Sequence, residues 1–142
     1  MDVYFSLGVF RKLRRMITYI NLFYMIYNLI LGSIYVEVSY YSYPQLTANG
    51  EYFHPESLTC ASTFLPFNTL VTLQKGNLQR TLRVNDRGPF KMHRDGSPVY
   101  PLEKHEVRVF DVSERAYREL FNGTESGTGN VFIISIEKPK GN

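Results

Sequence analysis

Strand-forming residues give way to turn-forming residues in Arg83-Val84-Asn85-Asp86-Arg87-Gly88-Pro89-Phe90. Gly88-Pro89 ends strand pairing, because proline has no amide hydrogen to donate and glycine readily adopts turn conformations. Asp86 therefore stands where a strand ends, and its side chain is predicted at the surface of a sheet. The alternative is an Asx turn, in which the carboxylate only accepts hydrogen bonds from neighbouring amides. The local sequence leaves both interpretations open.

Short strand-like runs lie on both sides of this stretch, at residues 35–42, 69–74, 79–85, 106–112 and 130–137. Lys75-Gly76-Asn77 joins two of these runs and predicts a β-hairpin. A helix is expected over residues 114–121, with Ser113 as its N-cap and Asn122-Gly123 at its end. Runs spaced in this way are typical of a small β-barrel or sandwich.

Four blocks, in order, carry a resemblance to a known family: residues 47–53 (TANGEYF), 58–69 (LTCA and LPFNT), 83–90 (RVNDRGPF) and 108–113 (RVFDVS). They resemble the RlpA-like (rare lipoprotein A) double-psi β-barrel family, over roughly residues 38–136. The resemblance implies an all-β, six-stranded double-psi β-barrel with one short α-helix at residues 36–142. A hydrophobic helix would precede this barrel within residues 1–35.

The same resemblance implies an endolytic peptidoglycan lytic transglycosylase. Such an enzyme cleaves MurNAc-GlcNAc glycan strands and forms 1,6-anhydroMurNAc without consuming water. The family is related to expansins, which loosen wall polymers without clear hydrolysis. The alternative is therefore a non-catalytic, expansin-like module that binds or loosens cell-wall glycan.

Cleavage of a glycosidic bond needs an acid that protonates the leaving oxygen, and carboxyl groups do this well. The catalytic candidates are Asp86, Asp111 and Glu51, with Asp86 as the first choice for the essential acid. A pair formed by Asp86 and Asp111 would raise the pKa of one member. Asp111 and Glu51 each have a simpler interpretation as well. Asp111 would be a charge near a helix N-terminus, and Glu51 would be a solvated carboxylate after a turn.

Candidate substrate-binding residues are Arg87, Asn85, Ser62, His54 and Tyr41, and Tyr40, Tyr43 and Tyr52 are further candidates for stacking on sugar rings. Two of these positions depart from the family pattern. Ser62 stands where the family has histidine, and His54 stands where it often has aspartate. The loss of an imidazole favours the non-catalytic alternative.

The segment at residues 91–105 is longer than the family's usual link between the two aspartate motifs, so it either reshapes the groove or forms a solvated excursion. No metal site or other cofactor is expected, because the three histidines lack a second ligand at a recognised spacing. Cys60, the only cysteine, matches a small alanine of the family and is expected to be buried.

The N-terminal segment, residues 1–35, reads as a signal peptide or signal anchor. Arg11, Lys12, Arg14 and Arg15 precede 21 uncharged residues, 16–36. Basic residues tend to stay cytoplasmic, so the barrel is expected outside the cytoplasm, in the periplasm or cell envelope, released or anchored in the membrane. A buried or surface amphipathic helix is the alternative.

The charge distribution bears on the partners. The net charge of +3 comes entirely from the first 35 residues, and residues 36–142 hold 12 basic and 12 acidic side chains. A nucleic-acid partner is not expected, because phosphate binding needs a basic face on the folded domain. The expected partners are peptidoglycan glycan strands, the bacterial membrane through the N-terminal segment, and septal cell-division proteins.

Overall fold

The computed structural model describes residues 2–31, 34–43 and 45–139. The chain forms two compact units, residues 1–33 and residues 34–142. The first holds one helix, and the second holds the strands and a short helix. Each unit is described by itself.

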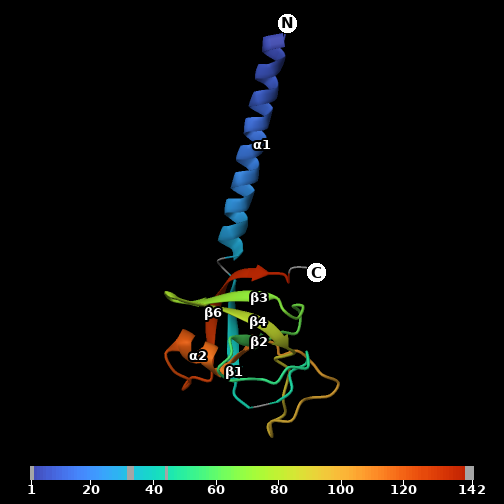
Figure 1. Ribbon diagram of the computed structural model, residues 1–142, viewed down its shortest axis with the longest axis vertical. Helices are drawn as coiled ribbons and strands as arrows, with labels where there is room; N and C mark the ends of the chain where they lie inside the picture. The colour runs from blue at the N-terminus through green and yellow to red at the C-terminus, as the bar shows by residue number, and fades with distance from the viewer. Residues whose placement is uncertain (1, 32–33, 44, 140–142) are drawn as a thin grey trace. The chain divides into compact units, whose positions relative to one another are not determined.

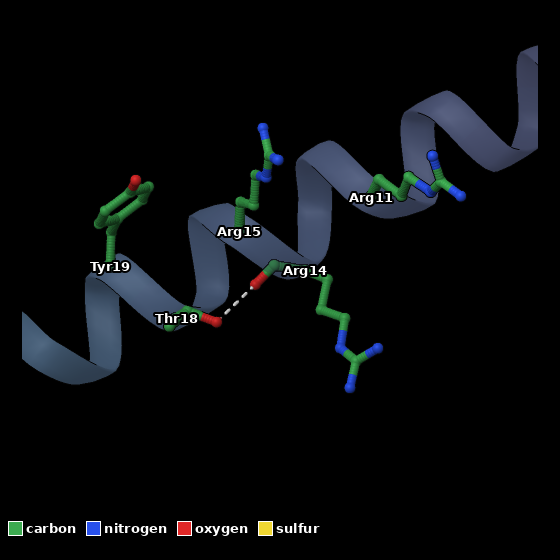
Figure 2. Close-up of a pocket in the computed structure, with 5 residues that line it drawn as sticks. All are labelled: Arg11, Arg14, Arg15, Thr18 and Tyr19. Carbon is green, nitrogen blue, oxygen red and sulfur yellow. Dashed lines mark hydrogen bonds between the residues drawn. The ribbon is translucent and has the colours of Figure 1, made fainter.

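Helix α1 (Asp2–Leu31) has 30 residues. Figure 2 shows Arg11, Arg14 and Arg15 projecting from it, with the Thr18 hydroxyl donating a hydrogen bond to the Arg14 carbonyl at 2.9 Å. Within the described part of the chain, no helix combines the length and apolar character needed to cross a bilayer. The leader or anchor at residues 1–35 stays a prediction.

Six strands form a closed barrel in the order β1-β5-β2-β4-β3-β6 (Figure 1). The pairs β1·β5 and β2·β4 are parallel, and the other four are antiparallel. This confirms the six-stranded barrel that the family resemblance implied. The strands are β1 (Tyr35–Tyr41), β2 (Thr59–Ala61), β3 (Leu70–Lys75), β4 (Leu78–Asp86), β5 (Arg108–Ser113) and β6 (Thr128–Glu137).

Five of these strands overlap the five runs expected from the sequence. Strand β2 has only three residues and was not among those runs. All three are buried, and β2 pairs with β4 on one side and β5 on the other. Tertiary pairing therefore makes this segment a strand, because three residues carry too little alternation to be recognised alone.

Alternate side chains of the strands fill the barrel. Helix α2 (Glu114–Phe121) covers part of this core with Ala116, Tyr117 and Leu120. Val38, Cys60, Phe110 and Val112 point into this core. Their neighbours along the strands, Ser39, Ala61 and Asp111, therefore point to the other face. The buried core residues are Val38, Cys60, Val71, Leu73, Leu82, Val84, Phe110, Val112, Ala116, Tyr117, Leu120, Val131 and Ile133.

The connections that follow β1 and β4 lie at one end of the barrel, where the chain between β4 and β5 forms the golden loop in Figure 1. The outward-facing residues of β1, β2 and β5 and the end of β4 meet these loops. The candidate site is built at this end.

Candidate functional site

Strand register places four residues in one row across the barrel. Ser39 of β1 is paired with Asp111 of β5, Asp111 with Ala61 of β2, and Ala61 with Asp86 of β4. Neighbouring strands lie about 4.8 Å apart, so the backbones of Asp86 and Asp111 are separated by roughly 10 Å. The small Ala61 side chain lies between them and is buried, with the turn at Gly88 close to it.

A β-bulge turns Asp86 to this face. Cys60 is paired with Val84, but the next residue, Ala61, is paired with Asp86, so Asn85 is the extra residue of β4. Without the bulge, Asp86 would share the inward face of Val84. Bulges commonly redirect a side chain beside an active site, and this one brings Asp86 to the face of Asp111.

Asp86 is 9% exposed. Its Oδ1 accepts hydrogen bonds from the Ala48 amide and from the Arg87 amide, both at 2.8 Å. The Arg87 amide belongs to the next residue, whereas an Asx turn uses the amide two residues on. The bond from Ala48 joins a distant loop to the end of β4. The side chain is thus anchored through one oxygen at the end of the barrel.

Tyr41 lies near the carboxylates of both Asp86 and Asp111. Its hydroxyl is buried and faces Asp86. Burial raises its pKa above the ordinary range, and the negative charges of Asp86 and Asp111 add to this effect. Its ring stacks on Phe53 with the centroids 4.2 Å apart. Tyr41 therefore stands beside the carboxylate pair.

Asp111 is the carboxyl group with a raised pKa. Burial is the main cause, and the charge of Asp86 acts in the same direction. The hydrogen bond that Ser39 donates to Oδ1 and the charges of Arg108 and His105 oppose the rise. Arg108 donates to the Ser39 hydroxyl at 2.8 Å and lies 3.7 Å from Oδ1 of Asp111. The net effect favours the protonated acid.

Gly88 brings the turn close to Asp111. Its φ is +142°, a conformation that L side chains rarely adopt. A Cβ at this position would lie 3.6 Å from Asp111 Oδ2 and 3.7 Å from Ala61 Cβ. Glycine is therefore required by the backbone conformation, and its turn borders the space between the two aspartates.

Glu51 is held in a different way. Both of its oxygens accept hydrogen bonds from the Arg83 guanidinium, at 2.7 and 2.8 Å, and the Asn85 amide donates to Oε2 at 3.2 Å. The bonds from Arg83 are the largest cause that lowers the Glu51 pKa to about 2. Glu51 is thus ionised near neutral pH, and it fixes Asn85 beside Asp86. Its predicted catalytic role stays a prediction.

Arg87 and Ser62 support the turn beneath Asp86. The Arg87 guanidinium donates to the carbonyls of Ser62 and Leu65, both at 3.0 Å, and lies over the Phe67 ring at 3.8 Å. Ser62 is fully buried, and its amide donates to the Asp86 carbonyl at 3.1 Å. Arg87 and Ser62 are thus both engaged in hydrogen bonds within the protein. The contact with sugar that the sequence suggested for them stays a prediction.

The remaining candidates are His54, Tyr40, Tyr43 and Tyr52. His54 is an exposed loop residue whose carbonyl accepts the Ser57 amide. Tyr43 and Tyr52 are 80% and 79% exposed. Tyr40 packs on the core residue Tyr117 with the ring centroids 4.9 Å apart. Stacking on a sugar is thus geometrically open to Tyr43 and Tyr52, whereas Tyr40 belongs to the core.

Ser39 and Arg108 are the residues that sequence reasoning missed. The bond from Ser39 to Asp111 depends on the pairing of β1 with β5, which joins positions 72 residues apart. The one local signal was Arg108, which stands three residues before Asp111 in the RVFDVS block. In the described residues, no group of three or more His, Cys, Asp or Glu side chains could hold a metal ion.

A pocket of about 540 Å³ adjoins the row formed by Ser39, Asp111, Ala61 and Asp86 and is here called the loop pocket. It lies between the start of the connection after β2, the segment after Gly88 and the segment that enters β5. Arg108 belongs both to its lining and to the surroundings of Asp111. Its lining includes Phe64, Phe90, Leu102, Lys104, His105 and Arg108.

Comparison with known proteins places these features in context. Residues 34–133 match the model of the family described as lytic transglycolase. The endolytic peptidoglycan transglycosylase RlpA of Campylobacter jejuni is 50% identical over 50 residues, which are 34% of this chain and 18% of that protein. The protein of the same name from Vibrio cholerae is 34% identical over 98 residues, 66% of this chain and 32% of that protein.

A third relative extends the comparison. The endolytic peptidoglycan transglycosylase RlpA of Helicobacter pylori is 32% identical over 92 residues, 63% of this chain and 24% of that protein. The matched region thus covers about a third or less of the length of these three relatives. The family-model match, residues 34–133, lies within the unit that holds the strands.

Proposed function

Because this chain belongs to the lytic transglycolase family, with residues 34–133 matching its model, we propose that its barrel cleaves peptidoglycan glycan strands. The observation that carries this proposal is the placement of Asp86 and Asp111 in register on either side of Ala61. One of the two carboxyl groups has a raised pKa, and this is the direction of shift that suits a general acid. The names of the relatives support the same reaction class.

The proposed reaction needs one proton donor and no water. Asp111 donates its proton to the bridging oxygen between MurNAc and GlcNAc, and that bond to the anomeric carbon breaks. Positive charge develops on the anomeric carbon, and the carboxylate of Asp86 stabilises it. The 6-hydroxyl of the same MurNAc then attacks this carbon and gives its proton back to Asp111. The product is 1,6-anhydroMurNAc.

In this proposal Asp111, rather than Asp86, donates the proton to the bridging oxygen. Burial and the charge of Asp86 both favour the neutral form of Asp111. Asp86 is anchored by two amide donors, which hold its side chain in place. Both residues remain necessary, because the charge of Asp86 contributes to the raised pKa of its neighbour.

The test is release of anhydro-muropeptides from purified sacculi by the full chain, followed by mass spectrometry. Soluble 1,6-anhydro products are expected from the wild type, and neither Asp86→Asn nor Asp111→Asn should yield them. Asp95→Asn is the matched control, since Asp95 lies in the loop at residues 91–105 and its carboxylate bonds Ser97. Products that persist in both site variants would refute the assignment.

The departures at Ser62 and His54 favour a second candidate, an expansin-like module that binds glycan without cleaving it. The family histidine is replaced by a fully buried serine whose hydroxyl accepts the Leu65 amide at 3.2 Å. Under this alternative, wild-type chain cosediments with sacculi and releases no anhydro product. Release that depends on Asp111 excludes this candidate.

We also propose that the barrel works outside the cytoplasm, in the cell envelope, with residues 1–35 as leader or membrane anchor. Support comes from the basic residues 11–15 and the uncharged residues 16–36 that follow them. A reporter enzyme active only outside the cytoplasm, fused after residue 142, should be active in bacteria and lose activity when residues 1–35 are deleted. Equal activity with and without the segment would refute the proposal. Septal cell-division proteins remain predicted partners.

A further inference from the structure

Helix α1 carries a cluster of basic side chains that no nearby acidic residue of the helix can neutralise. Arg11, Lys12, Arg14 and Arg15 are all exposed. Neither Asp nor Glu occurs from residue 3 to residue 36. An ion pair within a helix joins residues three or four positions apart, so these cations have no such partner along α1. The segment therefore presents concentrated positive charge.

Residues 9–20 of α1 have two distinct faces. Successive residues of an α-helix are rotated by about 100° around its axis. The four basic residues, with Thr18 and Tyr19, then fall in one arc of about 160°, and Figure 2 shows Arg15 and Tyr19 on the same side of the helix. Leu22 falls in this arc as well, so the division ends before it. The opposite arc, about 120° wide, holds apolar residues alone. They are Val9, Phe10, Leu13, Met16, Ile17 and Ile20, and all are exposed.

The partner that fits this segment must match both faces. A membrane surface does so, because its phosphate headgroups are charged and its acyl boundary is apolar. The ring and hydroxyl of Tyr19 suit the boundary between these two layers. A second copy of the helix would also cover the apolar face, but it would bring like charges together, whereas anionic headgroups would neutralise them. Charge complementarity therefore favours an anionic lipid surface.

We propose that residues 9–20 bind the surface of membranes that carry anionic phospholipids. The segment lies along the surface, with its apolar face at the acyl boundary and its basic face among the phosphates. This goes beyond the proposed role of residues 1–35 as leader or anchor, because it names the lipid and the placement of the helix. It is independent of glycan cleavage.

The test is cosedimentation of the full-length chain with vesicles of phosphatidylcholine alone and with vesicles of equal parts phosphatidylcholine and phosphatidylglycerol. Tighter binding to the anionic vesicles is expected, and added salt should reduce this preference. Arg14→Gln and Arg15→Gln should each weaken binding to the anionic vesicles by about fivefold, the contribution of one basic residue near such a surface. Glutamine is a good helix former, so both variants keep the helix.

Arg94→Gln is the matched control, because it makes the same change at an exposed residue of the loop at residues 91–105. It should leave binding to both kinds of vesicle unchanged. Equal binding of the wild type to both vesicles, or equal effects of Arg14→Gln and Arg94→Gln, would overturn the proposal. Because no glycan is present, this result and the release of anhydro product from sacculi can each fail without the other.

Tryptophan fluorescence tests the placement of the helix, because the chain has no tryptophan of its own. Ile20→Trp puts the indole on the apolar face, and Thr18→Trp puts it on the basic face at nearly the same point along α1. With anionic vesicles whose acyl chains carry bromine, the emission of Ile20→Trp should be quenched much more than that of Thr18→Trp. Equal quenching of the two would place the helix through the bilayer and overturn the proposal.

Discussion

Asp86 and Asp111 lie in register on the two strands that flank β2, and both are paired with Ala61. Their proximity has an electrostatic consequence, because the charge of Asp86 adds to burial in raising the Asp111 pKa. The pair is held on separate strands by different donors: backbone amides for Asp86, and the Ser39 hydroxyl for Asp111. The two positions can therefore be altered one at a time.

Asp111→Asn should abolish anhydro product and leave the fold intact, because asparagine keeps an oxygen that accepts the Ser39 bond. An acid with a raised pKa is most compatible with the fold when protonated. Its favourable contribution is therefore present below its ordinary pKa of 3.8 and is lost as pH rises through the folded value. Near pH 7 the variant should be at least as stable as the wild type, and near pH 3 the two should be alike.

Urea denaturation of both proteins at these two pH values measures the difference. A variant less stable than the wild type at pH 7 but not at pH 3 would contradict the raised pKa of Asp111. Asp95→Asn serves again as the control, because the bonds from Ser97 lower the pKa of that carboxyl.

Ser39→Ala should move the alkaline limb of the pH profile of kcat/KM to higher pH. The Ser39 hydroxyl lowers the Asp111 pKa by bonding its carboxylate, so removal of the hydroxyl raises the pKa further. More enzyme then retains the proton at alkaline pH. Ser135→Ala, on β6, should leave the limb in place. A shift to lower pH in Ser39→Ala would rule out Asp111 as the proton donor.

The sequence predicted much of the barrel because alternation and turns are local signals. The hairpin of β3 and β4 follows from Lys75-Gly76-Asn77, and α2 spans the predicted residues 114–121. The six-stranded closure came from the family resemblance, since strand order depends on pairings between distant segments. The local sequence pattern could not predict strand β2, because this strand has only three residues.

The site was predictable in its residue types and much less so in its contacts. Asp86 and Asp111 were paired as a hypothesis, and the structure brings them to one face through a bulge at Asn85 that no spacing reveals. The Asp86 carboxylate accepts one bond from the neighbouring Arg87 amide and one from the distant Ala48 amide, and its catalytic role stays a prediction. The ion pair of Glu51 with Arg83 joins positions 32 residues apart, so local sequence could not show it.

Glu51→Gln should lower the free energy of unfolding by about 1 kcal/mol or less at pH 7, the range for a bidentate but partly exposed pair. The Glu51 pKa is lowered from 4.5 to about 2, so the contribution is present above pH 4.5 and is lost as pH falls toward 2. Denaturation of both proteins at pH 7 and pH 2 should show a difference only at pH 7.

Anhydro product should persist in Glu51→Gln, since Glu51 is ionised and bound to Arg83. Glu125→Gln, an exposed glutamate in the loop before β6, is the control and should change neither stability nor product. Loss of product with unchanged stability would instead assign Glu51 to the chemistry, as the sequence first suggested.

Arg87→Lys should destabilise the turn beneath Asp86 by about 1–2 kcal/mol, because lysine cannot reproduce the planar guanidinium. The guanidinium bonds two carbonyls and lies over the Phe67 ring at 3.8 Å. Urea denaturation gives the loss, and hydrogen exchange should quicken at the amides of Phe64 and Leu65, which donate to the Ser62 hydroxyl. Arg94→Lys, in the exposed loop, should change neither quantity. If Arg87 instead contacts sugar, Arg87→Lys would weaken cosedimentation with sacculi while unfolding and exchange stay at wild-type values.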